Sequence, residues 1–414
     1  MKIRYLIMNA FGVGGTIRTV INQANAMAAG HDVELISVFR TRRIPAFPID
    51  PRVRVRVLAD RRGPRWRHPF RAWLLRQPSR LIPQAEVRYA TFNRYSDARI
   101  ANYLRSLHGG VLVTTRPALN LLAARFAPDS VVRVAQEHMH LDSHKPALAA
   151  EIARWYPRLD AVVTLTLADT ARYAAVLDGT GTVLTTIPNA LTPAERRPAD
   201  LAGRIVVAAG RLTRQKGFDL LIEAFAVVAD AHPDWQLRIY GDGRERARLE
   251  RLIHRLHLYN HVFLMGGTTA LEEEFAKGAA FVLSSRYEGF GMVLIEAMAH
   301  GLPVVSFDCP HGPGEIVTHG TDGLLVPPRD VSELAAAIGR LVADEPLRHR
   351  LGSAARIAAA RYEMGEIRLQ WERLFTRLEA ARSGRNERNG RNERNGGHRR
   401  CGRASPSSAD RLIG

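Results

Sequence analysis

The stretch SSRYEGFGMVLIEAMAHG, residues 284–301, follows the apolar run AAFVL and has seven residues between two glutamates, Glu288 and Glu296. Gly289 and Gly291 follow the first glutamate, and glycines let backbone N–H groups approach a ligand closely. A helix that begins here adds unpaired N–H donors and the positive end of its dipole. This order predicts a ligand site for an anion that carries hydroxyl groups, such as a sugar phosphate. The alternative is a surface turn with two solvated glutamates.

Strand-like and helix-like runs alternate along the chain on both sides of this stretch. Repeated βαβ units form parallel sheets that are covered by helices on both faces. We therefore predict an α/β fold with two Rossmann-like, doubly wound domains at residues 1–190 and 204–360. Residues 191–203 are rich in Pro, Ala and charged residues, which is typical of a linker.

The C-terminal part of the chain changes character twice. Residues 361–380 have an apolar stripe that includes Trp371 and predict a helix. Residues 381–414 contain the tandem repeat RNERNGRNERNG, which is polar and has no apolar face. Such a segment cannot bury enough apolar surface to fold, so we predict disorder there.

Composition sets limits on partners and compartment. The net charge is +18, and much of it lies in residues 52–80, with ten Arg and one Asp, and in 381–414, with nine Arg and three acidic residues. Only four of the 59 basic residues are lysines, so the excess of arginine favours no specific nucleic-acid partner. Two cysteines and no apolar run of eighteen residues predict a cytoplasmic chain without a transmembrane helix.

Residues 61–80 interleave aromatic and aliphatic residues with arginine. Trp66, Phe70 and Trp73 lie among the arginines, and the run PFRAWLLRQ has room for one or two helical turns. This composition is typical of an element that lies peripherally on an anionic membrane, here its inner face. It is also that of a loop whose aromatic side chains pack inward and whose arginines are solvated, and both interpretations stay open.

Two further loops combine glycine with the start of a helix. In GRLTRQKGFDLL, residues 210–221, Arg211 and Lys216 precede a helix at the carboxyl end of a strand, where two cations suit a diphosphate. In FGVGG, Gly14 and Gly15 permit close approach to a phosphate, although Ile17 stands where a dinucleotide fingerprint has its third glycine. Solvated cations and a structural turn are the respective alternatives.

A histidine-rich segment, QEHMHLDSH at residues 136–144, follows a strand of the first half. Without a second His/Cys cluster, a metal site is weakly supported. A histidine such as His138 that donates a hydrogen bond into a cleft between domains, or a structural histidine, fits better. The loop FDCPHGPGEIV at residues 307–317 also ends a strand, and we interpret Cys309 as a small apolar residue rather than a nucleophile.

Taken together, these motifs resemble one family. The glycine-rich first loop, G-R-L-x-x-x-K-G, E-G-F-G-M-V-L-I-E-A-M-A-x-G-x-P-V-V and G-x-x-G-L-L-V-P resemble the retaining GT-B glycosyltransferases of family four, glycosyl transferases group 1. The resemblance covers residues 1–378 and is strongest over 205–330. The PHGPGEI loop resembles that of the family's subset that acts on cell-wall polymers, teichoic-acid-type chains and exopolysaccharides.

The resemblance implies two domains that face a cleft, with the sugar nucleotide mainly on the second domain and the helix at 361–380 crossing back to the first. It implies that Arg211 and Lys216 hold the donor diphosphate, Glu288 the sugar and Glu296 the ribose. It also implies that Gly14 and Gly15 close on the diphosphate and that His138 touches the sugar. The remaining contacts are backbone amides of Gly289, Phe290, Gly291, Met292 and Val293. The catalytic set is then Glu288, Lys216, Arg211 and His138.

The predicted reaction moves a hexose-type sugar from a nucleotide diphosphate, with UDP favoured over GDP, to a hydroxyl of a cell-envelope glycan, polymer or lipid acceptor. No Asp-X-Asp triplet occurs in the chain, so we expect no metal and no cofactor, and the two cations take the role of the ion. The alternatives are a nucleotide-sugar epimerase of the same fold and a glycoside hydrolase that uses Glu288 and Glu296.

Overall fold

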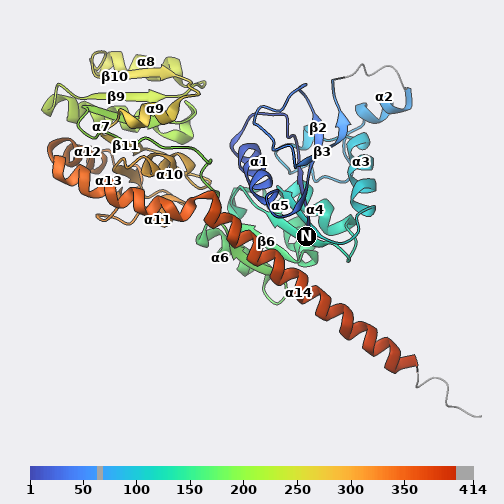
Figure 1. Cartoon of the computed structure of the whole chain (residues 1–414). Helices are drawn as coiled ribbons and strands as arrows, with labels where there is room; N and C mark the ends of the chain where they lie inside the picture. The colour runs from blue at the N-terminus through green and yellow to red at the C-terminus, as the bar shows by residue number, and fades with distance from the viewer. Residues whose placement is uncertain (63–68, 398–414) are drawn as a thin grey trace, which may run out of the picture. The chain divides into compact units, whose positions relative to one another are not determined.

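The structure is a computed structural model that describes residues 1–62 and 69–397, with side chains at 1–62 and 72–383 (Figure 1). The chain divides into two units, residues 1–370 and 371–414. The first unit contains both predicted parallel sheets, which confirms the α/β fold expected from the alternating pattern. The boundaries predicted between its two halves remain predictions.

The first half is built on a seven-stranded, all-parallel sheet with strand order β3-β2-β1-β4-β5-β6-β7. Its strands are β1 (Lys2–Ile7), β2 (Asp32–Arg40), β3 (Arg54–Asp60), β4 (Val111–Thr115), β5 (Val132–Gln136), β6 (Ala161–Thr164) and β7 (Val183–Thr186). Its α-helices are α1 (Gly15–Met27), α2 (Pro69–Arg76), α3 (Arg94–Arg105), α4 (Pro117–Phe126), α5 (Pro146–Trp155) and α6 (Leu167–Leu177).

The second half is built on a six-stranded, all-parallel sheet with order β10-β9-β8-β11-β12-β13. Its strands are β8 (Ile205–Ala209), β9 (Gln236–Tyr240), β10 (Val262–Gly266), β11 (Ala280–Leu283), β12 (Val304–Phe307) and β13 (Gly323–Val326). Its helices are α7 (Phe218–Ala231), α8 (Arg246–Arg255), α9 (Leu271–Ala276), α10 (Met292–Ala299), α11 (Pro313–Ile316), α12 (Val331–Ala343) and α13 (Glu345–Ala359). Residues 188–203 between the sheets, all of them described, form neither helix nor strand.

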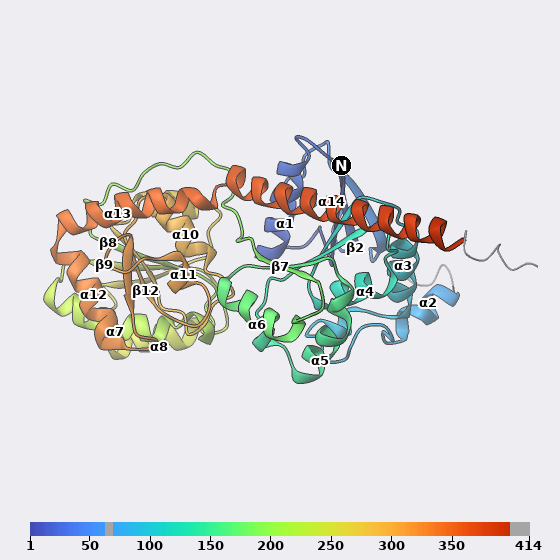
Figure 2. The ribbon, with the colours of Figure 1, turned by 90° about the horizontal axis from the view of Figure 1, so that it is seen from below.

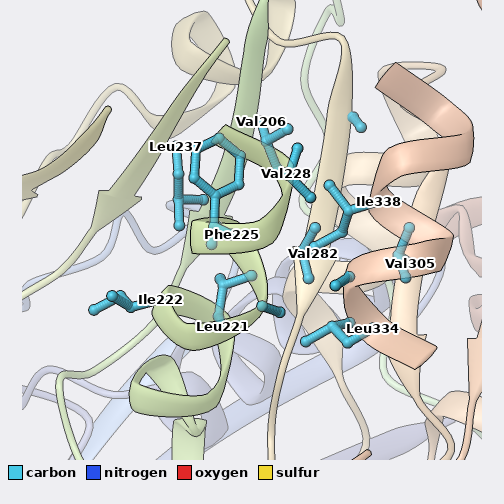
Figure 3. Close-up of a cluster of buried hydrophobic side chains, with 14 of the residues drawn as sticks. Val206, Leu221, Ile222, Phe225, Val228, Leu237, Val282, Val305, Leu334 and Ile338 are labelled. Atoms are coloured by element: carbon cyan, nitrogen blue, oxygen red, sulfur yellow. The ribbon is translucent and has the colours of Figure 1, made fainter. Parts of the chain in front are cut away.

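Helical periodicity explains how the second sheet is covered. Leu221, Phe225 and Val228 lie on one face of α7 and are buried with Leu334 and Ile338 of α12 against the sheet (Figure 3). Each such side chain contributes about 1.5–3 kcal/mol by burial. Helices α10 and α13 cover the opposite face (Figure 2). Both faces of the strands are therefore apolar, as parallel sheets require.

The strand order decides where a ligand can bind. In the second sheet β8 and β11 are neighbours although they are not consecutive, so the loops after them diverge to opposite faces and leave a crevice. The loop after β8 contains Arg211 and Lys216, and the loop after β11 contains Glu288. Pairing of β8 with β11 thus brings together the two loops that we predicted to bind the ligand.

Gly217 shows why these loops need glycine. Its φ is +63°, and a Cβ atom added there would lie 2.0 Å from the backbone oxygen of Ser284. Only glycine lets the Lys216–Gly217 backbone pass this close to the loop after β11. The glycine of the Lys-Gly motif is therefore required for packing of the two loops.

Helix α2 confirms the short helix expected after residue 68, but only part of the Arg-rich segment is described. Trp66 and the side chain of Phe70 lie outside the described part of the chain. The Trp73 side chain is 47% exposed, and the Arg94 guanidinium carbon lies 5.5 Å from its ring centroid. None of the described helices is long and apolar enough to cross a bilayer.

The last helix corrects the prediction of disorder. Helix α14 runs from Met364 to Gly397, so residues 381–397 are helical, whereas disorder was predicted from residue 381. Arg and Glu are good helix formers and the repeats contain no proline, so a helix already formed upstream can propagate through them. Residues 398–414 lie outside the described residues. The predicted crossing of this helix to the first domain stays a prediction.

We predict that Gly217→Ala destabilises the protein by several kcal/mol, because it adds a steric clash to a left-handed backbone. Gly320→Ala is the matched control: its φ is +75°, but an added Cβ atom meets nothing within 4 Å. The control should cost only about 1–2 kcal/mol of backbone strain. Urea unfolding of both variants measures the difference, and equal costs would contradict this packing argument.

Candidate active site

A cavity of about 820 Å³, called the central cavity below, lies within the first unit. The start of α1 and the loops after β5, β6 and β7 line it from the first half, together with the loops after β8, β9, β10 and β11 of the second. The predicted residues that line it are Gly15, His138, Arg211, Lys216, Glu288, Gly289, Phe290, Gly291, Met292, Val293 and Glu296. Gly14 is not among its lining residues and stands at the N-cap of α1.

An ion pair joins the two loops of the second sheet inside this cavity. Lys216 Nζ lies 2.5 Å from Glu288 Oε1, and both side chains are largely buried. The same carboxylate oxygen accepts a hydrogen bond from Ser285 Oγ at 2.5 Å. A buried carboxylate needs such partners, since an unpaired one would be costly to desolvate. The pair places a cation and a polar acceptor at one point of the cavity.

The loops behind this ion pair are held in place by their own backbone contacts. Ser284 Oγ donates to the backbone oxygen of Lys216 at 2.9 Å, and Gln215 Nε2 donates to that of Tyr287 at 3.0 Å. Arg286 forms two hydrogen bonds with the carboxylate of Asp219, at 2.8 and 2.9 Å. Both functional loops are therefore rigidly tied to each other before any ligand binds.

Glu296 lies one turn into α10, whose N-cap is Gly291 with φ +104°. Burial raises the pKa of Glu296, while the nearby Arg18 and Arg196 act in the opposite direction. The carboxylate of Glu296 makes no hydrogen bond or ion pair with any residue that the structure describes. A carboxylate in a cavity with no protein partner is suited to accept hydrogen bonds from ligand hydroxyls.

The histidine segment extends from the first half to Glu288. His140 Nε2 lies 2.6 Å from the backbone oxygen of Glu288, and the His140 ring stacks on that of His311 with 3.6 Å between centroids. His138 lines the central cavity, and its buried Nε2 has no hydrogen-bond partner among the described residues. Burial lowers the pKa of His138 to about 4, with a smaller effect of Arg116, so the ring is neutral near pH 7.

The PHGPGEI loop makes a second connection to the first half. The carboxylate of Glu315 accepts hydrogen bonds from the backbone N–H groups of Leu167 at 2.6 Å and Ala168 at 3.0 Å, at the start of α6. Gly312 permits this loop to lie on the glycine-rich stretch: its φ is +106°, and a Cβ atom there would be 2.0 Å from the backbone oxygen of Phe290. The motif thus positions the site from outside the cavity.

Beneath the histidine segment, a buried polar network supports β5. Glu137 accepts hydrogen bonds from Tyr156 and from Asn120, the latter at 2.7 Å. Burial raises the pKa of Glu137 to about 7, although these two hydrogen bonds act against the shift. Because Glu137 immediately precedes His138, its protonation state bears on how that segment is held.

Two further observations concern the histidine segment and Cys309. Within residues 1–62 and 69–397, no group of three or more His, Cys, Asp or Glu residues is arranged to hold a metal ion. Cys309 is buried, and burial raises the pKa of its thiol to about 12, which fits the apolar role expected for it.

Sequence reasoning missed several lining residues. His140, and not His138, makes the hydrogen bond to the Glu288 backbone. Polar lining residues that no motif indicated are Thr16, Thr19, Asn189, Asp242 and Thr268. Asp242 follows β9 in YGDG, so its place after a strand beside glycines was an available signal. The threonines of α1 carried no such signal.

Comparison with solved structures identifies the class of fold. A mutant of TarM from S. aureus, determined with fondaparinux, alpha-GlcNAc-glycerol and UDP, aligns with a TM-score of 0.71 at 17% identity and covers 90% of this chain and 99% of its own. At this identity the likeness shows the fold alone. The fold is that of the GT-B glycosyltransferases.

A family model matches the second half of the chain. Residues 194–358 match the model of glycosyl transferases group 1. The match includes the loops after β8 and β11 that carry Lys216 and Glu288.

Two relatives extend the similarity over most of the chain. An exopolysaccharide phosphotransferase of Streptomyces coelicolor is 39% identical over 92% of this chain, which spans only 41% of that protein's length. An uncharacterized glycosyltransferase of Haemophilus influenzae is 25% identical over 90% of this chain and 99% of its own length.

We predict that Glu137→Gln gains stability relative to the natural chain as the pH rises from 4.5 to 7. The folded state raises the pKa of Glu137 from 4.5 to about 7, so its contribution is complete below pH 4.5 and is lost as the pH rises through 7. Glutamine keeps an acceptor oxygen but does not titrate. The relative gain should reach about 3 kcal/mol.

Urea unfolding between pH 4.5 and 8 measures this effect. The exposed Glu273→Gln serves as control for the loss of one carboxylate from the chain. A difference between Glu137→Gln and the natural chain that does not change with pH would contradict the shifted pKa.

Proposed function

We propose that the protein is a retaining, metal-independent glycosyltransferase that moves a hexose-type sugar from UDP to a hydroxyl of a cell-envelope glycan, polymer or lipid-linked acceptor. The observation that carries the proposal is the 2.5 Å contact between Lys216 and Glu288 at the start of α10. A diphosphate needs cations and N–H donors, whereas a sugar needs hydroxyl acceptors. Both requirements meet at this point of the central cavity.

The donor is proposed to lie along the second sheet. Its diphosphate contacts Arg211, Lys216 and the amides of Gly289 to Val293, with Gly14 and Gly15 approaching from α1. Its sugar hydroxyls bind Glu288, and its ribose binds Glu296, whose carboxylate has no partner among the described residues. UDP is favoured because the S. aureus structure of the same fold contains UDP. No cofactor is required.

In the proposed reaction, the bond between the anomeric carbon and the diphosphate oxygen breaks, and its electron pair stays on that oxygen. The acceptor oxygen forms the new bond on the same face of the sugar, and the acceptor proton passes to the departing diphosphate. Lys216 and Arg211 stabilise the charge that develops, which lowers the barrier without a metal ion. The neutral His138 hydrogen-bonds a sugar hydroxyl.

The acceptor is proposed to belong to the cell envelope, in line with the exopolysaccharide relative. We place the protein in the cytoplasm, where nucleotide sugars are available, with peripheral contact of residues 61–80 with the inner face of the membrane. The exposed Trp73 is compatible with that contact.

One observation supports glycoside hydrolysis as a second candidate. Glu288 is ion-paired with Lys216, whereas burial raises the pKa of Glu296. Two carboxyl groups in different environments are what such hydrolases use as nucleophile and acid. Incubation with a glycan and no nucleotide sugar tests this candidate, because a hydrolase would release free sugar.

We predict that Glu288→Ala and Glu296→Ala separate the two ends of the donor. A ligand that binds only the folded state raises the melting temperature. Glu296→Ala should lose most of the shift with UDP and with UDP-glucose, because both contain the ribose. Glu288→Ala should keep the UDP shift and lose the additional shift from the sugar. Loss of the UDP response in Glu288→Ala but not in Glu296→Ala would reverse the assignment.

We also predict that Lys216→Ala lowers turnover at least about 100-fold, which corresponds to about 2.7 kcal/mol of transition-state stabilisation. Lys277→Ala is the matched control, since Lys277 is 54% exposed, pairs with Glu274 and does not line the central cavity. Sugar transfer in the presence of EDTA should continue unchanged. Near-normal turnover of Lys216→Ala would exclude its role at the diphosphate.

A further inference from the structure

Beside the central cavity lies a second cavity of about 500 Å³, here called the arginine groove. Its lining residues are Arg211, Thr213, Arg214, Gln215, Arg244, Arg286, Tyr287 and Arg329. Five of these eight residues are arginine and none is acidic, whereas Lys and Arg together make up only 59 of the 414 residues of the chain. The general excess of arginine in the chain does not account for this concentration.

The groove is built at the edge of the second sheet where the central cavity also lies. Its residues come from the loops after β8, β9, β11 and β13, and parallel strands present all their carboxyl ends at one edge. Arg211, Gln215 and Tyr287 line both cavities. A ligand chain bound in the groove would therefore lie next to the Lys216–Glu288 ion pair.

Most of the guanidinium groups are available to a ligand. Arg211, Arg214 and Arg329 are exposed and make no side-chain hydrogen bond or ion pair with any residue in the described part of the chain. Arg244 is 80% exposed, and its nearest carboxylate oxygen, on Glu245, is 3.9 Å away. Only Arg286 is committed to the fold, through its two hydrogen bonds to Asp219.

The backbone of the groove has one strained residue. Arg329 adopts a φ of +65°, in the left-handed region that residues other than glycine rarely occupy. Such a conformation costs about 1–3 kcal/mol and is concentrated at functional sites. An arginine at this position, where glycine would be unstrained, is consistent with a use for its guanidinium.

We propose that the arginine groove binds a segment of the acceptor that carries repeated anionic groups, either phosphodiesters or carboxylates. Planar guanidinium groups bind the oxygen atoms of both through paired hydrogen bonds. The ring of Tyr287, which is 56% exposed, offers a flat surface between the two cavities. This inference rests on the proposed glycosyltransferase function and specifies the chemical class of its acceptor as a polyanionic chain.

A membrane surface fits the groove less well. A peripheral membrane site combines basic residues with exposed apolar side chains. Here the site is concave, and Tyr287 is the one exposed large apolar or aromatic residue among its eight lining residues. A flexible chain can follow a concave surface that a bilayer cannot enter.

The test compares three proteins: the natural chain, the groove variant Arg214→Ser/Arg244→Ser/Arg329→Asn, and the control variant Arg251→Ser/Arg255→Ser/Arg340→Ser. Asn is chosen at position 329 because it tolerates the left-handed backbone. The control removes three exposed arginines from α8 and α12, so the net charges match. Arg211 is left intact because it belongs to the proposed donor site.

The probes are fluorescent hexamers of glycerol phosphate and of galacturonate, with a neutral dextran hexamer for comparison, in fluorescence anisotropy at several salt concentrations. The groove variant should bind an anionic hexamer at least tenfold more weakly than the control does, with a salt slope lower by roughly three. Binding of one hexamer and not the other identifies phosphodiester or carboxylate as the recognised group.

Phosphatidylglycerol vesicles are tested with the same three proteins. Three results would overturn the proposal: equal binding of the anionic hexamers by the groove and control variants, binding of the dextran as tight as that of the anionic hexamers, or a loss confined to the vesicles. The UDP-induced rise in melting temperature is measured in parallel. Absence of that rise in the natural chain counts against the proposed function. A normal rise together with unaltered hexamer binding in the groove variant counts against the arginine groove alone.

Discussion

The ion pair between Lys216 and Glu288 is the contact on which the site depends. It can form because β8 and β11 are neighbours, and because Gly217 lets one loop backbone pass against Ser284. Ser284, Gln215 and Arg286 then hold both loops in register. Burying a cation and a carboxylate together costs desolvation free energy. A pair buried in a cavity in spite of this cost is consistent with a role in binding.

Much of the fold and part of the site could be predicted from sequence, because the responsible signals are local. Strands and helices alternate with clear apolar periodicity, and both glycine-rich loops come directly after strands. The carboxyl ends of parallel strands share an edge, so Arg211, Lys216 and Glu288 were expected together, and they do line one cavity. Gly14 was the exception, since the closest approach to the cavity is made by the next residue.

What could not be predicted depends on contacts between segments far apart in sequence. The spacing of His138 and His140 does not reveal which ring reaches the Glu288 backbone, since that depends on where the second half lies. The arginine groove collects residues from four loops spread over more than a hundred positions. At residues 381–397 the local composition predicted disorder, but the residues are helical. They continue a helix that begins upstream, at Met364.

The most direct measurement is a crystal structure of the full chain with a non-hydrolysable UDP-glucose analogue. The account predicts diphosphate oxygens within hydrogen-bond distance of Lys216 Nζ and Arg211, sugar hydroxyls at Glu288 and the ribose at Glu296. A diphosphate bound away from Lys216, or a sugar placed at Glu296, would contradict it.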